Sequence, residues 1–459
     1  MNECLSEYYR CPDNFSSFEL SGPVSDETGY FQFGANTLYG KISAGGVSRL
    51  PRGPLRNVLP DCSYRAGSLS LPFNPTEVLN DLRFETYAER SKKTLPATSM
   101  RGRAYYFVRP ILPVRFRKHL QKIRLNGWQE LQFPSWPVDT TVEDVLERLL
   151  LLSLRMQKEK EIPFIWFWPN GASSCALMTH DVETASGRDF CASLMDINDA
   201  YGIKASFQVV PERRYDVPRH YLDSMSDRGF EINVQDLNHD GHLFRDQERF
   251  LARARKINEY GRQFGAKGFR AAVLYRRQEW FQALEFSYDT SVPNVAHLDP
   301  QRGGCCTVMP YFIGNLVELP VTTTQDYMLF HILEKRSIEL WKQQIDLIMS
   351  KNGLMTFIVH PDYIIDREEL TTYKNLLSYL AELKANKNVW MPLPWEAAYW
   401  WKQRANMKLI QENGAWRIDG EGSDRATVAY ATEQDGNLVY SFESAKLLSE
   451  APGITSRTH

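Results

Sequence analysis

The sequence predicts an α/β protein whose main domain is a distorted (β/α) barrel of seven or eight strands. After residue 174, short apolar runs alternate with amphipathic helical segments, a pattern typical of repeated βα units and a mainly parallel sheet. Roughly 220 residues hold these units, the size expected of such a barrel. Several apolar runs end in acidic, imidazole or guanidinium side chains, and barrels of this kind carry active sites at the carboxyl ends of their strands.

The order of the expected elements follows from the same pattern. We expect strands at residues 175–179, 205–210, 231–234, 268–272, 286–289, 316–320, 355–359 and 389–392. Helices are expected at residues 190–201, 219–228, 246–264, 337–350 and 367–384. The alternative, a doubly wound open sheet, has less support because the sequence contains no Gly-x-Gly-x-x-Gly turn.

The barrel domain is expected to span residues 171–405, with a smaller region on each side. Residues 1–170 combine Gly-, Pro- and Ser-rich stretches with short alternating runs, which predict an irregular β-containing region that ends in a linker helix at 145–160. Residues 406–459 alternate again and contain the turn pairs Asn413-Gly414 and Asp435-Gly436. This last segment therefore predicts a small antiparallel β appendage.

The composition restricts the classes of partner and the compartment. Lysine and arginine (54) nearly balance aspartate and glutamate (56), so no overall charge attracts nucleic acid. No uncharged apolar stretch reaches the roughly 20 residues that cross a bilayer, and no transmembrane segment is expected. The seven cysteines lack zinc-binding spacing, and the first residues lack the features of a signal peptide. We therefore expect a cytoplasmic protein that acts on a small or neutral molecule.

The first strand end carries two carboxylates, Asp181 and Glu183, two residues apart. One could bind a cation while the other acts as a base, although such pairs are also common at surfaces and helix caps. His239 follows another strand end, with Gln235 four residues before it. Imidazole and carboxylate ligands suit zinc or a similar divalent metal, and the alternative is that His239 caps a turn.

Further candidates lie at or near later strands of the predicted barrel. Arg270 could orient a carboxylate or form an ordinary salt bridge. His360 could be a general acid or a buried structural residue, and Asp289 on a neighbouring strand could fix its tautomer. Tyr275 and Trp280 could stack on a sugar ring, although most aromatic side chains fill cores.

Four of these segments read Thr179-His180-Asp181-Val182-Glu183, Asp236-Leu237-Asn238-His239-Asp240-Gly241, Gly268-Phe269-Arg270 and Val359-His360-Pro361. Their order resembles that of the polysaccharide deacetylase superfamily, the chitooligosaccharide deacetylase homologues. The resemblance covers residues 172 to about 400. It implies a distorted (β/α) barrel that removes N- or O-acetyl groups from sugars with a metal-bound water.

The resemblance also implies catalytic roles. Asp181 would be the general base, Arg270 would orient that base, and His360 would be the general acid. Beside these groups, we expect Asp289 to belong to the catalytic set as the residue that holds His360.

The metal ligands that the resemblance implies differ from those of the family. Glu183 would replace a metal-binding aspartate, His239 would be the second metal histidine, and Gln235 stands where the family has its first metal histidine. A glutamine oxygen is a weaker zinc ligand than an imidazole nitrogen, and His242 or His180 could complete the site. The expected cofactor is zinc, with cobalt or nickel as alternatives, and Gln235 means that metal use is altered or lost.

The sequence therefore supports a metal-dependent hydrolase that removes an acetyl group from an N-acetylated sugar or from a nucleotide- or lipid-linked glycan precursor. The alternative is a catalytically inactive deacetylase-like protein that binds carbohydrate or acts as a scaffold in polysaccharide biosynthesis. A third possibility is hydrolysis of another C–N bond, such as that of a cyclic amide or ureide. Metal content would separate the first two possibilities.

Overall fold

The structure is a computed structural model of the 459-residue chain, and it describes residues 3–15, 17–43, 45–65, 67–89, 125, 127–156 and 160–444. The chain forms two compact units. The first comprises Met1–Leu79, Glu143–Gly171 and Gln403–His459, and the second comprises Asn80–Val142 and Ala172–Lys402. All of the predicted site residues lie in the second unit.

The first unit is built mainly from short strands. Its described residues form four small sheets: β1 (Phe18–Leu20) with β5 (Ser68–Leu71) and β4 (Ser63–Arg65); β2 (Gly29–Phe33) with β3 (Asn36–Gly40); β16 (Lys408–Glu412) with β17 (Ala415–Asp419); and β6 (Glu161–Ile165) with β18 (Val428–Gln434) and β19 (Asn437–Ser441). Helix α1 (Glu3–Tyr9) and most of α6 (Thr141–Met156) belong to the same unit. Helix α2 (Pro75–Arg83) begins there.

Two tight hairpins shape the C-terminal part of this unit. Asn413 and Gly414 join β16 to β17, and Asp435 and Gly436 join β18 to β19. All four residues have φ between 50° and 83°, which is the left-handed conformation that two-residue hairpin turns require. The antiparallel pairing of β18 with β6 places residues 428–432 beside residues 161–165 in one sheet.

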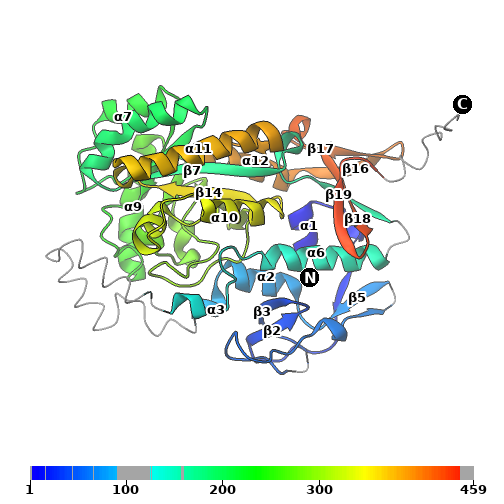
Figure 1. Cartoon of the computed structure of the whole chain (residues 1–459). Helices are drawn as coiled ribbons and strands as arrows, with labels where there is room; N and C mark the ends of the chain where they lie inside the picture. Colours follow the sequence, from blue (N-terminus) through cyan, green and yellow to red (C-terminus); the bar gives the residue numbers. More distant parts are fainter. Residues whose placement is uncertain are drawn as a thin grey trace, which may run out of the picture. The chain divides into compact units, whose positions relative to one another are not determined.

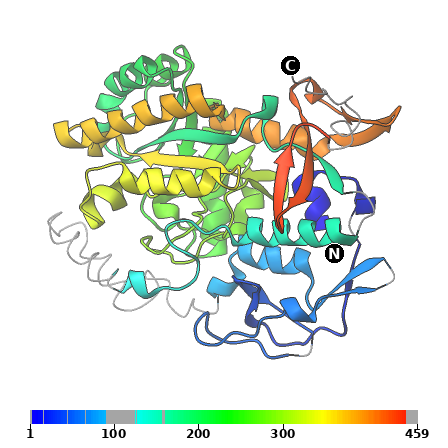
Figure 2. The ribbon, with the colours of Figure 1, turned by 45° about the vertical axis from the view of Figure 1, so that its right-hand side comes forward.

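The second unit contains a nine-stranded sheet, which Figures 1 and 2 show with β7 and β14 side by side. Its order is β12-β13-β11-β10-β9-β8-β7-β14, with β15 also paired to β7, and β12–β13 is its one antiparallel pair. The strands are β7 (Ser174–Val182), β8 (Ala205–Val209), β9 (Glu231–Gln235), β10 (Gly268–Arg270), β11 (Tyr288–Asp289), β12 (Tyr311–Ile313), β13 (Leu316–Glu318), β14 (Leu354–Val359) and β15 (Val389–Trp390).

Helices cover the outer face of this sheet (Figure 1). They are α7 (Ala185–Ala200), α8 (Arg219–Ser226), α9 (Gln247–Phe264), α10 (Glu339–Met349) and α11 (Arg367–Lys387), and the short α3 (Thr86–Glu89) precedes them. Helix α12 (Pro394–Asn406) begins beside Glu231 at the amino end of β9 and continues into the first unit. Apolar side chains of β7, β8 and β14 pack against α7, α10 and α11 in one buried cluster. Helix α7 begins earlier than predicted, because the Thr184 hydroxyl accepts from the Gly187 amide and caps the helix. No helix among the described residues is both long and apolar enough to cross a membrane.

Threonine side chains close the sheet into a barrel. The chain that follows β13 runs beside β14, where the Thr322 hydroxyl donates to the Leu354 carbonyl at 2.7 Å and the Thr323 hydroxyl donates to the Thr356 carbonyl at 2.8 Å. The Thr356 amide donates to Thr322 Oγ1 at 2.9 Å. Side-chain bonds thus replace a backbone ladder at this edge. The predicted distorted (β/α) barrel is confirmed.

A polar cluster fills the barrel near the amino ends of its strands. The Tyr288 hydroxyl donates to Glu231 Oε1 at 2.7 Å and accepts from Asn233 Nδ2 at 2.6 Å. The Trp395 amide donates to Glu231 Oε2 at 3.1 Å. The ring of Tyr288 lies so close to Gly268 that a Cβ there would be 2.1 Å from the ring. Burial raises the pKa of Glu231 to about 7.

We expect Glu231→Gln to flatten the dependence of the unfolding free energy on pH. The folded pKa of about 7 exceeds the unfolded value of about 4.3, so this group contributes stability that is fully present below about pH 4.3 and lost as pH rises through 7. The difference is on the order of 3 kcal/mol. Chemical denaturation at several pH values would measure it.

The exposed Glu382→Gln on α11 serves as the control, because its side chain is already solvated. It should leave the pH dependence unchanged. A Glu231→Gln protein that loses stability with pH as steeply as the wild type would contradict the assignment.

Candidate active site

The carboxyl end of β7 sends alternate side chains to opposite faces of the sheet. Thr179 and Asp181 point into the barrel, whereas His180 lies on the outer face. There, His180 Nε2 is 2.9 Å from Asn198 Nδ2, and His180 Nδ1 is 3.1 Å from the Val359 carbonyl oxygen. Burial lowers the pKa of His180 to about 3. His180 is therefore a neutral structural residue that points away from the barrel interior.

A buried ion pair joins β7 to β10 inside the barrel. Arg270 Nη1 donates to Asp181 Oδ1 at 2.7 Å and to Thr179 Oγ1 at 3.0 Å. Arg270 Nε and Nη2 both donate to Thr290, which follows β11. The side chain of Arg270 is fully buried and that of Asp181 is 5% exposed. Arg270 thus holds the Asp181 carboxylate in one orientation, with Oδ2 left for other contacts.

Glu183 lies where three nitrogen-bearing side chains converge. Its Oε1 is 2.6 Å from His239 Nε2 and 3.6 Å from His360 Nε2. It also accepts from Gln235 Nε2 at 3.1 Å. The same Gln235 nitrogen donates to Asp181 Oδ2 at 3.2 Å. Residues predicted from β7, β9 and β14 therefore meet at one point.

The turn after β9 brings His239 back toward that point. Asp236 and His239 have φ of 52° and 53°, a left-handed conformation that is uncommon for residues other than glycine. The Asp236 amide donates to the Arg270 carbonyl at 2.9 Å, and Asp236 Oδ1 accepts from the Leu237 amide at 2.6 Å. Neighbouring bonds thus hold the strained backbone at Asp236, and the turn aims the His239 imidazole at Glu183.

Asp326 holds His360, and the prediction that Asp289 does so is wrong. His360 Nδ1 is 2.7 Å from Asp326 Oδ1, and the His360 amide donates to Asp326 Oδ2 at 2.6 Å. Asp289 instead accepts from the amide and hydroxyl of Ser291 at 2.8 Å, and it lies opposite Glu318 in the sheet. Strand alternation explains the difference, because Tyr288 fills the interior and Asp289 points to the other face.

Burial and charge act in opposite directions on the central groups. Burial alone would raise the pKa of Glu183, but His239 and His360 hold that pKa well below its usual range. Burial would lower the pKa of His360, but Asp326 and then Glu183 raise it well above the usual value. Burial is likewise outweighed at His239, where Glu183 raises the pKa. The carboxylates are therefore balanced by cationic groups within the site.

The donor set fits a divalent cation. One donor atom from each of Asp181, Glu183 and His360 lies within 4.8 Å of the others. His239 Nε2 is close to Glu183 but lacks hydrogen-bond geometry, and Gln235 Oε1 is buried without a hydrogen-bond partner. Gln235 presents its NH₂ group to the carboxylates, and an amide N–H cannot bind a cation. Half a turn of the amide would bring the oxygen there instead.

Other predicted residues lie elsewhere. Tyr275 and Trp280 pack in a hydrophobic cluster around α9, with the Trp280 ring 5.4 Å from that of Phe250. His242 Nδ1 lies 3.7 Å from a carboxylate oxygen of Asp240. The aromatic ring beside the site is that of Tyr363, whose centroid is 4.7 Å from that of His360. In the sequence, Tyr363 could have been recognised as a site residue because it lies only three residues after His360.

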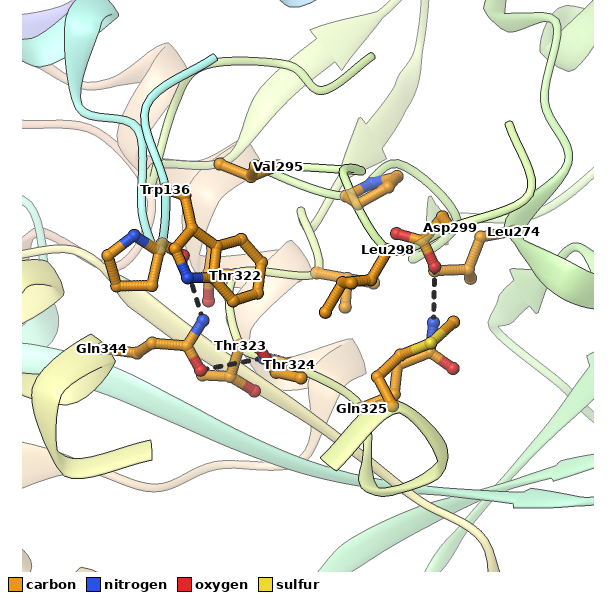
Figure 3. A pocket seen from close by; sticks show the side chains of 14 residues that line it. Trp136, Leu274, Val295, Leu298, Asp299, Thr322, Thr323, Thr324, Gln325 and Gln344 are labelled. Carbon is orange, nitrogen blue, oxygen red and sulfur yellow. Dashed lines mark hydrogen bonds between the residues drawn. The ribbon is translucent and has the colours of Figure 1, made fainter. Parts of the chain in front are cut away.

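A cavity borders the segment that leads to Asp326 (Figure 3). Gln344 bridges its wall by donating to the Pro137 carbonyl at 3.0 Å and accepting from the Thr324 amide at 2.9 Å. Gln325 donates to Asp299 Oδ1 at 3.2 Å. The lining includes none of the groups gathered around Glu183. The cavity therefore lies beside residues 321–325, which precede Asp326, and is separate from the candidate active site.

Comparisons with known proteins find similar solved structures. No protein-family model and no curated protein matches the chain. A Mycobacterium smegmatis protein assigned as a polysaccharide deacetylase is 18% identical, with 52% of this chain and 93% of that chain covered and a TM-score of 0.43. The allantoinase PuuE is 14% identical, with 51% and 92% covered and a TM-score of 0.40. A Pseudomonas aeruginosa protein assigned as a polysaccharide deacetylase is 12% identical, with 51% and 92% covered and a TM-score of 0.40.

The class that the motif order resembles is thus represented among these structures. All three TM-scores are below 0.5.

We expect Gln235→His to increase affinity for Zn²⁺ by on the order of tenfold or more, because imidazole is the better zinc ligand. Gln235→Leu should not increase it, since leucine offers no donor atom. Calorimetric titration of metal into metal-free protein measures both. Gln263→His on the exposed part of α9 is the control for an added histidine, and equal gains in that variant and in Gln235→His would contradict a ligand position at 235.

Proposed function

We propose that this protein is a metal-dependent hydrolase that removes an acetyl group from an N-acetylated sugar or glycan precursor. The observation that carries the proposal is the convergence of Asp181, Glu183 and His360 at the carboxyl ends of neighbouring parallel strands. Arg270 and Asp326 each hold one of these groups through buried bonds of 2.7 Å. A carboxylate, a cation site and an imidazole acid are the groups that amide hydrolysis requires.

Each side chain has a role that its contacts support. Burial raises the pKa of Asp181 against the effect of Arg270, which suits a general base that takes a proton from water. His360 faces the site through Nε2 while Asp326 holds Nδ1, so Nε2 can donate a proton to the leaving amine. Glu183, His239 and, through its oxygen, Gln235 would hold a divalent cation, which supplies Lewis-acid polarisation of the acyl carbonyl.

The second candidate is a carbohydrate-binding or scaffold protein without catalysis. It is favoured by the present orientation of Gln235, whose NH₂ group bridges Asp181 and Glu183 where a cation would otherwise bind. An amide that donates to both carboxylates stabilises their negative charge, which a bound metal would otherwise do. The two candidates differ in metal content, because the first requires stoichiometric metal and the second requires none.

The first test is acetate release from a panel of N-acetylated sugars in the presence of Zn²⁺, Co²⁺ or Ni²⁺. We expect Asp181→Asn and His360→Gln each to lower kcat by about 10²–10⁴-fold, because each removes one proton-transfer group. Trp395→Phe, an exposed residue on α12, should retain wild-type activity. Absence of acetate release from every sugar with every metal would reject the enzyme and leave the binding protein.

The Asp326–His360 pair can be tested separately. Asp326→Asn keeps the size and one acceptor oxygen but removes the charge beside the imidazole, so we expect kcat to fall by about 10–100-fold while stoichiometric metal binding persists. Asp289→Asn should have a smaller effect on kcat, because Asp289 does not contact His360. A larger loss in Asp289→Asn than in Asp326→Asn would reverse the assignment of the two aspartates.

A further inference from the structure

Two adjacent arginines lie in the loop that joins β8 to α8. Arg213 and Arg214 are both exposed, and Arg213 has a left-handed φ of 68°. The loop follows the carboxyl end of β8, which lies between β7 and β9 in the barrel. Both guanidinium groups therefore belong to the same end of the barrel as Asp181 and Gln235.

Bonds on both sides hold these arginines in place. The Glu212 amide donates to the Leu237 carbonyl at 3.0 Å, directly after β9. The Tyr215 hydroxyl donates to the Val182 carbonyl at 2.6 Å and accepts from the Val210 amide at 3.0 Å. The residues that flank the pair are thus fixed to the ends of β7, β8 and β9. Arg213 and Arg214 are presented on a short, anchored loop.

Arg214 contacts the imidazole that faces Glu183. Its Nη2 lies 3.4 Å from His239 Nδ1, while His239 Nε2 lies 2.6 Å from Glu183 Oε1. Among the described residues, neither the Arg213 nor the Arg214 guanidinium forms an ion pair with a carboxylate. The cationic groups deeper in the site are all matched by Asp181, Glu183 or Asp326. Glu212 and Asp216 lie in the same loop, but neither forms an ion pair with these two guanidinium groups, which stay open to an anionic ligand.

The role of His239 Nδ1 at this contact depends on the imidazole tautomer, because Nδ1 accepts from the guanidinium only when the ring hydrogen lies on Nε2. In the imidazole tautomer that leaves Nε2 free to bind a cation, Nδ1 carries the hydrogen. A metal-binding histidine ordinarily donates that hydrogen to a carboxylate, a carbonyl or water. Here the neighbour is a guanidinium, which has donors only. An oxyanion beside both groups would accept from both.

We infer that Arg214, with Arg213 beside it, recognises an anionic group on the substrate. The inference deepens the proposed function and rests on it: the substrate class is an acylated sugar that carries a phosphate ester or a carboxylate near the acyl group. Guanidinium groups bind both anions through paired, charge-assisted hydrogen bonds. Arg214 is then a residue that determines specificity, and Asp181 and His360 remain the groups that act on the bond.

The test compares kcat/KM for N-acetylglucosamine, its 1- and 6-phosphates and N-acetylglucosaminuronic acid at fixed ionic strength. We expect at least one anionic sugar to be preferred by about tenfold or more in the wild type. Arg214→Ala should reduce that preference by about tenfold, and Arg214→Lys should restore part of it, because lysine keeps the charge but not the planar fork. The phosphate and uronate substrates separate the two sources of the anion.

Arg219→Ala on α8 is the matched control, since Arg219 is exposed and already pairs with Asp223 at 2.8 Å. It should retain the wild-type preference. Equal activity on neutral and anionic sugars in the wild type would overturn the inference. So would an Arg214→Ala protein that loses activity on both classes by the same factor, because that result indicates only support of His239.

A binding measurement separates failure of this inference from failure of the proposed function. Calorimetry with glucosamine 6-phosphate and glucosamine requires no turnover. If no sugar is hydrolysed but the phosphate ester binds at least tenfold more tightly than glucosamine, and Arg214→Ala removes that difference, the proposed function fails and the anion site stands. If neither turnover nor binding distinguishes the anionic from the neutral sugar, the anion site is rejected.

Discussion

The buried pair of Arg270 and Asp181 is the interaction on which the geometry of the site depends. A charge inside a barrel is costly unless opposite charge and hydrogen bonds surround it. Arg270 satisfies this condition by contacting Thr179 and Asp181 on β7 and Thr290 directly after β11. Because one rigid guanidinium binds all three, their spacing is fixed before any ligand arrives. A lysine could not supply the same planar set of donors.

The balance of charge explains how so many ionisable groups share one small space. Asp181, Glu183 and Asp326 each face a guanidinium or an imidazole. The amide of Gln235 bridges the two carboxylates nearest the centre. A neutral side chain at that position lets the carboxylates approach each other without adding charge. The same side chain offers a cation an oxygen in place of an imidazole nitrogen. Gln235 therefore stabilises the metal-free site and at the same time lowers its affinity for metal.

The sequence predicted the barrel well because β7 and β14 contain apolar runs that end in polar residues, and because amphipathic helical segments separate the strands. Strand ends then indicated Asp181, Glu183, Gln235, His239, Arg270 and His360, and the structure brings these six together. Asp326 was missed because it lies eight residues beyond β13, in a stretch that no strand pattern covers. Asp289 was chosen in its place because a strand only two residues long gives too little alternation to show which face a side chain occupies.

The threonine contacts that close the barrel have a mechanical consequence. Peptide groups in a ladder are fixed in direction, whereas a hydroxyl can turn its hydrogen about the Cβ–Oγ bond and follow a partner that moves sideways. The seam between residues 322–323 and β14 can therefore tolerate a small sideways shift without losing its bonds. Asp326 and His360 lie on opposite sides of that seam. A shift at the seam would therefore change the position of the His360 imidazole first. The hydrogen bond between His360 and Asp326 limits that change.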